Sequence, residues 1–183
     1  ERPQEVLAPP LMWADALDRM MSILARDASV DIGGIRAISG AAQQHGSVYL
    51  NRRARDVWRA LAHDQALAPQ LAGTFARELS PVWMDESSGA QCAAIEAALG
   101  GAAATAELTG SRAYARFAGP QIRKFRDTSP GGYDATTRIH LVSSFMASLL
   151  AGADAPLDPG DASGMNLMDI RSARWSEAAL EAT

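Results

Sequence analysis

Cysteine and lysine are nearly absent from this chain of 183 residues. Cys92 is the only cysteine, so the chain cannot form an internal disulfide and has no cysteine cluster that could bind zinc. Lys124 is the only lysine, and a Walker-type phosphate loop needs a lysine of its own, so the sequence excludes such a loop elsewhere in the chain. The cysteine content fits a reducing compartment, and we expect a cytoplasmic protein.

Long apolar runs and a strong excess of charge are also missing. No run approaches the roughly 20 apolar residues of a transmembrane helix, and residues 1–5 are too polar to open a secretory signal. The formal net charge is −4 without a long basic run, which argues against binding to nucleic acid or to an anionic membrane. With 48% hydrophobic and 21% charged residues, the composition is typical of one globular domain.

The residue patterns predict strands that alternate with amphipathic helices, which is the arrangement of an α/β protein. The predicted strands are Ile35–Ile38, Val48–Leu50, Val82–Met84 and Arg138–Val142. Helices are expected after Pro9-Pro10, after Ser87-Ser88 with a capping box from Ser88 to Gln91, over Ala102–Leu108, from Pro120, before Gly152 and around Trp175 and Leu180. Residues 154–164, rich in Pro, Gly and Asp, are expected to form a loop.

The chain is organised around a stretch that begins in the predicted strand at Ile35 and ends at Leu50. Its centre holds Gln43, Gln44 and His45 between two glycines, which permit sharp turns and close approach of another group. Two amides and an imidazole offer donors and acceptors without obligatory charge, which suits a neutral ligand rich in hydroxyl groups. The alternative is an ordinary strand–turn–strand whose polar tip faces water. The residues by themselves leave both interpretations open.

Asp85 ends the predicted strand Val82–Met84 and precedes a predicted helix. The carboxyl end of a strand is where α/β proteins place ligands, so Asp85 is a candidate ligand contact. A carboxylate at this position can equally stabilise the free N–H groups at a helix start. The sequence does not separate these two roles.

Two arginines, Arg112 and Arg116, lie in the predicted loop from residue 111 to residue 119. A guanidinium carries five donors in a rigid fork and can hold vicinal hydroxyls or offset developing negative charge. Either arginine could instead be a surface charge or a member of a structural ion pair. The pattern of charges alone does not decide between them.

No metal site is expected. Asp154, Asp158 and Asp161 are close in sequence, but the twelve-residue calcium loop and its terminal glutamate are absent. His63 has no Cys, His or carboxylate pair at ligand spacing and is interpreted as a surface histidine. The turn at Asp31-Ile32-Gly33 lacks the residues that would make it a phosphate-binding turn.

Several motifs, in order along nearly the whole chain, resemble the FGGY family of carbohydrate kinases, and within it the branch that acts on D-xylulose. Each motif is weak by itself, and the weakest part of the resemblance is Asn51–Leu79. The matching segments are Ile38–Val48 with its Gln-Gln-His-Gly core, Ser80–Asp85, Leu108–Phe117, Gly119–Lys124, Leu141–Leu149 and Ser163–Ile170.

The resemblance implies part of the N-terminal lobe of a kinase with a ribonuclease H-like, actin-like ATPase fold. Such kinases hold a sugar and ATP between two lobes, with Mg²⁺ offsetting charge, and an aspartate of the second lobe acts as base. Laid over the family pattern, His45 and Arg116 fall on sugar-binding positions, Gln44 lines the same site, and Arg112 is structural. The implied partners are a small sugar, D-xylulose, and ATP.

The chain departs from the family pattern in two places. The first phosphate-binding strand and turn should precede Glu1, and the second lobe, with the catalytic base and most nucleotide contacts, should follow Thr183. We therefore expect residues 1–183 to form a partial N-terminal domain that is inactive alone and phosphorylates D-xylulose only within a full-length enzyme. The alternatives are a kinase for ribulose, glycerol or gluconate, or a noncatalytic sugar-binding half-lobe.

Overall fold

The computed structural model describes residues 4–183, so the first three residues of the polar start lie outside the described part. The helices are α1 Leu11–Arg26, α2 Ala54–Ala60, α3 Leu67–Leu71, α4 Gly89–Ala98, α5 Ala102–Thr109, α6 Ala118–Thr128, α7 Pro130–Asp134, α8 Val142–Ala151, α9 Pro159–Ser163 and α10 Glu177–Glu181, with a 3-10 turn at Ile32–Gly34. The strands are β1 Leu7–Ala8, β2 Ser47–Asn51, β3 Ser80–Pro81, β4 Thr136–Leu141, β5 Met168–Asp169 and β6 Arg174–Trp175. None of the helices within residues 4–183 is long and apolar enough to cross a membrane.

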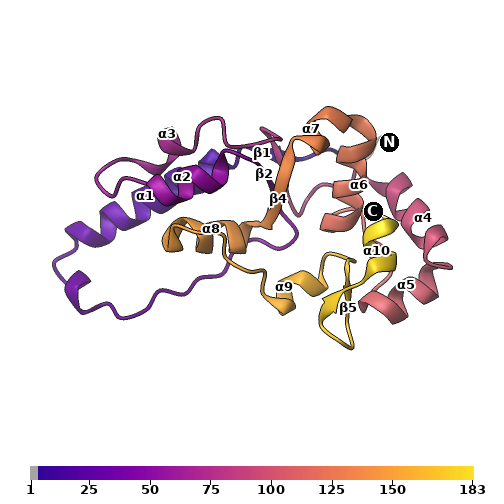
Figure 1. The fold of residues 1–183 in the computed structure, drawn as a ribbon. Coiled ribbons are helices and arrows are strands. Elements are labelled where there is room, and N and C mark those ends of the chain that lie inside the picture. Colours follow the sequence, from indigo (N-terminus) through magenta and orange to yellow (C-terminus); the bar gives the residue numbers. More distant parts are fainter. Residues whose placement is uncertain (1–3) are drawn as a thin grey trace.

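The antiparallel pair β2–β4 lies at the centre of the molecule (Figure 1). Helices α1, α2, α3 and α8 lie at one end of the view, and α4, α5, α6 and α10 at the other. The register runs from Ser47↔Leu141 to Asn51↔Thr136, with an irregularity between Leu50 and Asn51. Two shorter antiparallel pairs, β1–β3 and β5–β6, complete the strand pairing within the described residues.

The alternation of side chains along β2 creates two cores, because neighbouring residues of a strand point to opposite faces. Val48 and Leu50 pack into one core, with Trp58 of α2 and Phe145 of α8. Tyr49 packs into the other core with helix α6, where its ring lies 4.9 Å from that of Phe125. Burial of each such large side chain contributes about 1.5–3 kcal/mol to stability.

Several predicted elements are confirmed. The helix expected after Pro9-Pro10 is α1, the predicted strand Val48–Leu50 lies within β2, and the Arg138–Val142 prediction matches β4. Helix α8 ends at Gly152, whose backbone is left-handed with φ 63°. Ala102–Leu108 is α5, and the helix expected from Pro120 is α6.

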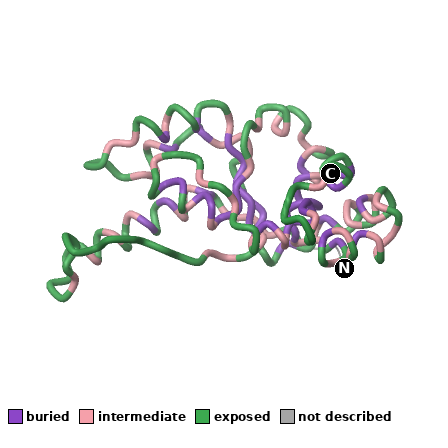
Figure 2. Tube along the Cα trace, turned by 60° about the horizontal axis from the view of Figure 1, so that its bottom comes forward, coloured by how far each residue is buried: buried purple, intermediate pink, exposed green. Residues whose placement is uncertain are grey.

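The predicted strand Ile35–Ile38 is wrong. These residues form an irregular segment, with Ile35 41% and Ile38 54% exposed, within the long exposed stretch that is green in Figure 2. A strand exists only where a neighbour completes its hydrogen bonds. One edge of β2 is paired with β4, and residues 74–76 occupy the other edge. There the Asn51 N–H donates to the Thr74 carbonyl, and the Ala76 N–H donates to the Tyr49 carbonyl. No strand within residues 4–183 lies beside residues 35–38.

Four smaller predictions are also corrected. Val82–Met84 is not a buried strand: only Ser80–Pro81 is paired, and Trp83 and Met84 are about half exposed in a turn. Ser88 does not close a capping box, because its hydroxyl donates to the Ala115 carbonyl instead. Trp175 belongs to β6 rather than to the last helix, and the loop predicted at residues 154–164 contains the short helix α9.

Asp85 is fully buried and joins three segments of the chain. One carboxylate oxygen accepts the Val6 N–H at 2.9 Å; the other accepts the Gln121 amide at 2.7 Å together with the N–H and hydroxyl of Ser87. Burial alone would raise the pKa of Asp85, but the bonds from Ser87, Val6 and Gln121 outweigh it and hold the pKa below 3.8. Both oxygens are used by the protein itself, and none of the donors is an N–H of α4, which begins at Gly89. Asp85 is therefore an anchor between chain segments, and the predicted role as a helix-start carboxylate is wrong.

We predict that Asp85→Asn lowers the free energy of unfolding by about 1–3 kcal/mol, because one amide NH₂ must then face a buried donor that has lost its acceptor. Urea unfolding measures the change. Asp27→Asn is the matched control, since Asp27 accepts the same pair of bonds from Ser29 but is exposed. The control should change stability by less than about 0.5 kcal/mol. Equal effects of the two substitutions would contradict the anchoring role.

Candidate functional site

His45 sits in the turn immediately before β2 and has an unusual backbone conformation, with φ 64°. Left-handed backbone is uncommon outside glycine and tends to persist where the surrounding structure imposes it. The half-buried imidazole lies against the ring of Phe117, with the centroids 4.5 Å apart and the planes tilted by 31°. The turn thus directs His45 toward the loop that precedes α6.

One hydrogen bond fixes the tautomer of His45. Its Nδ1 lies 3.2 Å from the carbonyl oxygen of Gly164. A carbonyl can only accept, so Nδ1 carries the hydrogen and donates it. In the neutral ring, Nε2 then has a lone pair available to accept a hydrogen bond.

The surroundings keep the imidazole neutral. Burial is the largest influence on the pKa of His45 and lowers it below 6.5, and the Arg116 guanidinium lowers it further. The Gly164 carbonyl and the Asp161 carboxylate act in the opposite direction without reversing the shift. At neutral pH, His45 is therefore an acceptor at Nε2 and a donor at Nδ1.

Arg116 is half-buried in the loop between α5 and α6, close enough to His45 to affect its pKa. Its guanidinium lies over the ring of Tyr114, 5.1 Å from the centroid. Tyr114 in turn packs on Phe117, with ring centroids 5.6 Å apart. The structure therefore brings the two residues predicted to bind sugar to the same aromatic cluster, from positions 71 residues apart in the chain.

Gln44 lies next to His45 and is exposed. Its carbonyl accepts the N–H of Gly46 at 2.8 Å, which closes the turn. Gln44 thus contributes a backbone hydrogen bond to the turn. Its side chain is exposed, and the residue directly precedes His45 in the sequence.

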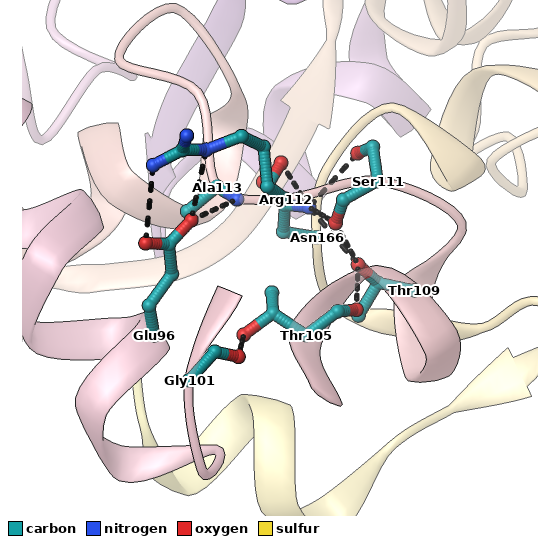
Figure 3. Close-up of polar contacts among 8 residues, drawn as sticks. All are labelled: Glu96, Gly101, Thr105, Thr109, Ser111, Arg112, Ala113 and Asn166. Atoms are coloured by element: carbon teal, nitrogen blue, oxygen red, sulfur yellow. Dashed lines mark hydrogen bonds and ion pairs between the residues drawn. The ribbon is translucent and has the colours of Figure 1, made fainter. Parts of the chain in front are cut away.

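The loop that carries Arg116 is fixed by buried polar contacts at its start (Figure 3). The side-chain amide of Asn166, fully buried, donates to the Thr109 hydroxyl at 3.0 Å and to the Ser111 carbonyl at 3.2 Å. Glu96 of α4 accepts the N–H of Ala113 at 3.0 Å and pairs with Arg112 at 3.3 Å. Arg112 therefore has the structural role that the resemblance implied.

Residues 161–166 are the third segment that meets at the candidate site, and sequence reasoning assigned them no site role. The Met165 carbonyl accepts the N–H of Gly119 at 2.8 Å, and a Cβ on Gly119 would lie 2.6 Å from that oxygen. A Cβ on Gly164 would lie 3.0 Å from the His45 ring. Small residues at both positions allow this close approach. The Gly119–Pro120 and Ser163–Gly164 motifs were the available signal, and only the fold shows that they meet.

The described residues contain no group of three His, Cys, Asp or Glu side chains that could hold a metal ion. His140 is fully buried, and its two ring nitrogens lie 3.1 Å from the Ser144 hydroxyl and 3.3 Å from Asp154. His63 is exposed.

We predict that NMR titration gives a pKa below 6.5 for His45. Arg116→Ala should raise this pKa, because it removes a nearby positive charge, and Asp161→Asn should lower it further. Arg171→Ala, at an exposed arginine that pairs with Glu107 at 2.9 Å, should leave it unchanged. The pKa of His45 is higher in the unfolded chain than in the folded one, so the unfolded chain binds this proton first as the pH falls. The free energy of unfolding therefore decreases as the pH falls from 6.5 through the folded pKa. Shifts of the opposite sign in the two variants would contradict this electrostatic description.

Comparison with known proteins places this geometry in a wider context. No family model matches the chain. Xylulose kinase 2 of Arabidopsis thaliana is 50% identical over 178 residues, which cover 97% of this chain and 32% of that protein. The xylulose kinase of Rattus norvegicus is 46% identical over 177 residues, 97% of this chain and 33% of its own.

The fold matches solved sugar kinases. The crystal structure of a ligand-bound xylulose kinase from Lactobacillus acidophilus superimposes with a TM-score of 0.73 at 16% identity, over 97% of this chain and 31% of that one. This match confirms the expected fold, because the chain has the same fold as about a third of that structure. The chain spans about a third of the length of the curated relatives it matches. Over almost its whole length, this chain is similar in sequence to proteins named xylulose kinases, of which it covers about a third.

Proposed function

We propose that this chain forms the sugar-binding side of the N-terminal domain of an FGGY carbohydrate kinase, a xylulokinase that converts D-xylulose to D-xylulose 5-phosphate. The observation that carries the proposal is the meeting of a neutral His45 and the cationic Arg116 at one aromatic cluster. The identity of half the aligned residues with a protein named xylulose kinase supports the choice of sugar.

The two side chains have complementary hydrogen-bonding capacity. His45 presents an acceptor at Nε2, and Arg116 presents only donors. A sugar hydroxyl can donate to the imidazole while its neighbour accepts from the guanidinium, so the pair fits a polyol or ketose. Gln44, exposed beside His45, would line the same site with an amide that can donate and accept.

The phosphoryl donor would be ATP with Mg²⁺. In phosphoryl transfer the protein mainly positions the attacking hydroxyl in line with the γ-phosphoryl group, and magnesium offsets the developing charge. In this proposal, residues 1–183 are a partial N-terminal domain, the aspartate base and most nucleotide contacts come from outside them, and the complete enzyme is cytoplasmic. The role of this chain is to bind and orient the sugar.

We predict that His45→Ala in the complete enzyme lowers kcat/KM for D-xylulose about 5- to 150-fold, the equivalent of a lost hydrogen bond worth about 1–3 kcal/mol. Thermal unfolding should change far less, because the ring is only half-buried. His63→Ala, at an exposed histidine, is the control and should alter neither quantity. A loss of folding that accounts for the loss of turnover would make His45 a structural histidine.

A panel of sugars tests the choice of substrate. The complete enzyme should phosphorylate D-xylulose faster than D-ribulose, glycerol or gluconate in a coupled ADP assay. The His45→Ala and Arg116→Ala variants should lose activity mainly toward the preferred sugar. Indifference of the wild-type enzyme to D-xylulose would overturn the choice of sugar while leaving the kinase assignment in place.

The 183-residue chain by itself should transfer no phosphate from ATP to D-xylulose. The measurement is product formation by the purified chain beside the complete enzyme. Detectable turnover by the chain alone would contradict the proposal that the base and nucleotide contacts lie outside it.

A further inference from the structure

A groove separate from the His45 cluster is lined by residues of β4, residues 154–157, α9 and β6. It has a volume of about 570 Å³, within the roughly 300–1,000 Å³ typical of small-ligand sites. Arg138 and Asp154 line one part of it, and Arg174 and Trp175 of β6 line another. His45 and Arg116 do not line it.

Among the residues that line the groove, the positively charged side chains outnumber the negatively charged ones. Asp154 pairs with Arg138 at 3.5 Å and lies 3.3 Å from Nε2 of His140, so it is shared between two neighbours. Burial, the largest influence, lowers the pKa of His140, so that this ring adds no charge at neutral pH. Arg174 is exposed and forms no ion pair within residues 4–183. The groove therefore carries a net positive charge with one guanidinium available.

A second hollow of about 260 Å³ shares Arg138 and Asp154 with the groove and adds Arg52 and Arg55. These two arginines are exposed and also form no ion pair within the described residues. The adjoining hollow brings no further carboxylate to its lining. Arginine suits phosphate because its planar fork can donate two parallel hydrogen bonds.

The remaining lining is apolar. Trp175 is 47% exposed although its ring lines the groove, and Pro156, Leu157 and Met168 line it as well. An inorganic anion would leave this apolar surface uncovered. A ligand that combines an anionic group with an organic body would cover both the guanidinium and the indole.

We propose that this groove binds a small phosphate monoester, with the phosphate at Arg174 and the organic part against Trp175. The class includes sugar phosphates of pentose size. The proposal does not depend on the proposed kinase function, because none of the residues proposed to bind D-xylulose lines the groove.

The test is isothermal titration calorimetry of the complete enzyme with D-ribose 5-phosphate, inorganic phosphate and D-ribose as separate ligands. Ribose 5-phosphate should bind about tenfold or more tightly than either of the other two. Arg174→Ala should weaken its binding about tenfold, as expected for loss of a charge-assisted hydrogen bond. Arg171→Ala is the matched control, because this exposed arginine lies three residues away but pairs with Glu107 at 2.9 Å on a different surface hollow.

Two further variants locate the ligand. Trp175→Ala should weaken the binding of ribose 5-phosphate but not of inorganic phosphate, and His45→Ala should leave both unchanged. Equal affinity for inorganic phosphate and its ester, or equal loss in Arg171→Ala and Arg174→Ala, would reduce the groove to a nonspecific cationic surface and overturn the proposal. Loss of binding in His45→Ala with none in Arg174→Ala would assign the ligand to the candidate sugar site and would also overturn it.

Discussion

The antiparallel pairing of β2 with β4 is the contact on which the rest of the structure depends. It separates the two cores, and it continues one residue beyond β2, where the N–H of Val142 donates to the Gly46 carbonyl at 3.1 Å. A Cβ on Gly46 would lie 2.8 Å from the Val142 side chain, so this close approach requires glycine. The chain enters this ladder from His45, whose backbone is left-handed and whose imidazole packs against Phe117.

The candidate sugar site is assembled from three segments that are distant in sequence. His45 comes from the turn before β2, Arg116 from the loop before α6, and the Gly164 carbonyl from the end of α9. Each segment is fixed by contacts away from the site: the β2–β4 ladder, the Asn166 and Glu96 hydrogen bonds, and the Gly119–Met165 bond. This division is physically sensible, since side chains that bind a ligand must be held by groups other than the ligand.

Helix α9 connects the two sites inferred for this protein. Pro159 and Ala162 of α9 line the arginine groove, whereas Gly164, which ends the helix, contacts His45. Asp161 of the same helix influences the pKa of His45 and accepts a hydrogen bond from the Ser143 hydroxyl. A helix of five residues thus contacts His45 through its end and lines the groove at Arg174 through Pro159 and Ala162.

Local residue patterns were enough to predict the strongly periodic helices and the strand at Val48–Leu50, and motif resemblance predicted the fold class and the candidate site residues. Apolar periodicity indicates which face of a single element is buried, and it predicted α1 and α8 correctly. It also predicted a strand at Ile35–Ile38, but no neighbour within residues 4–183 completes the hydrogen bonds of that segment. Only the tertiary structure decided that Asp85 is an anchor, that His45 is a neutral donor–acceptor, and that Arg138, Arg174 and Trp175 share a groove. The reason is physical: hydrogen-bond partners, burial and local charge arise from residues far apart in the chain.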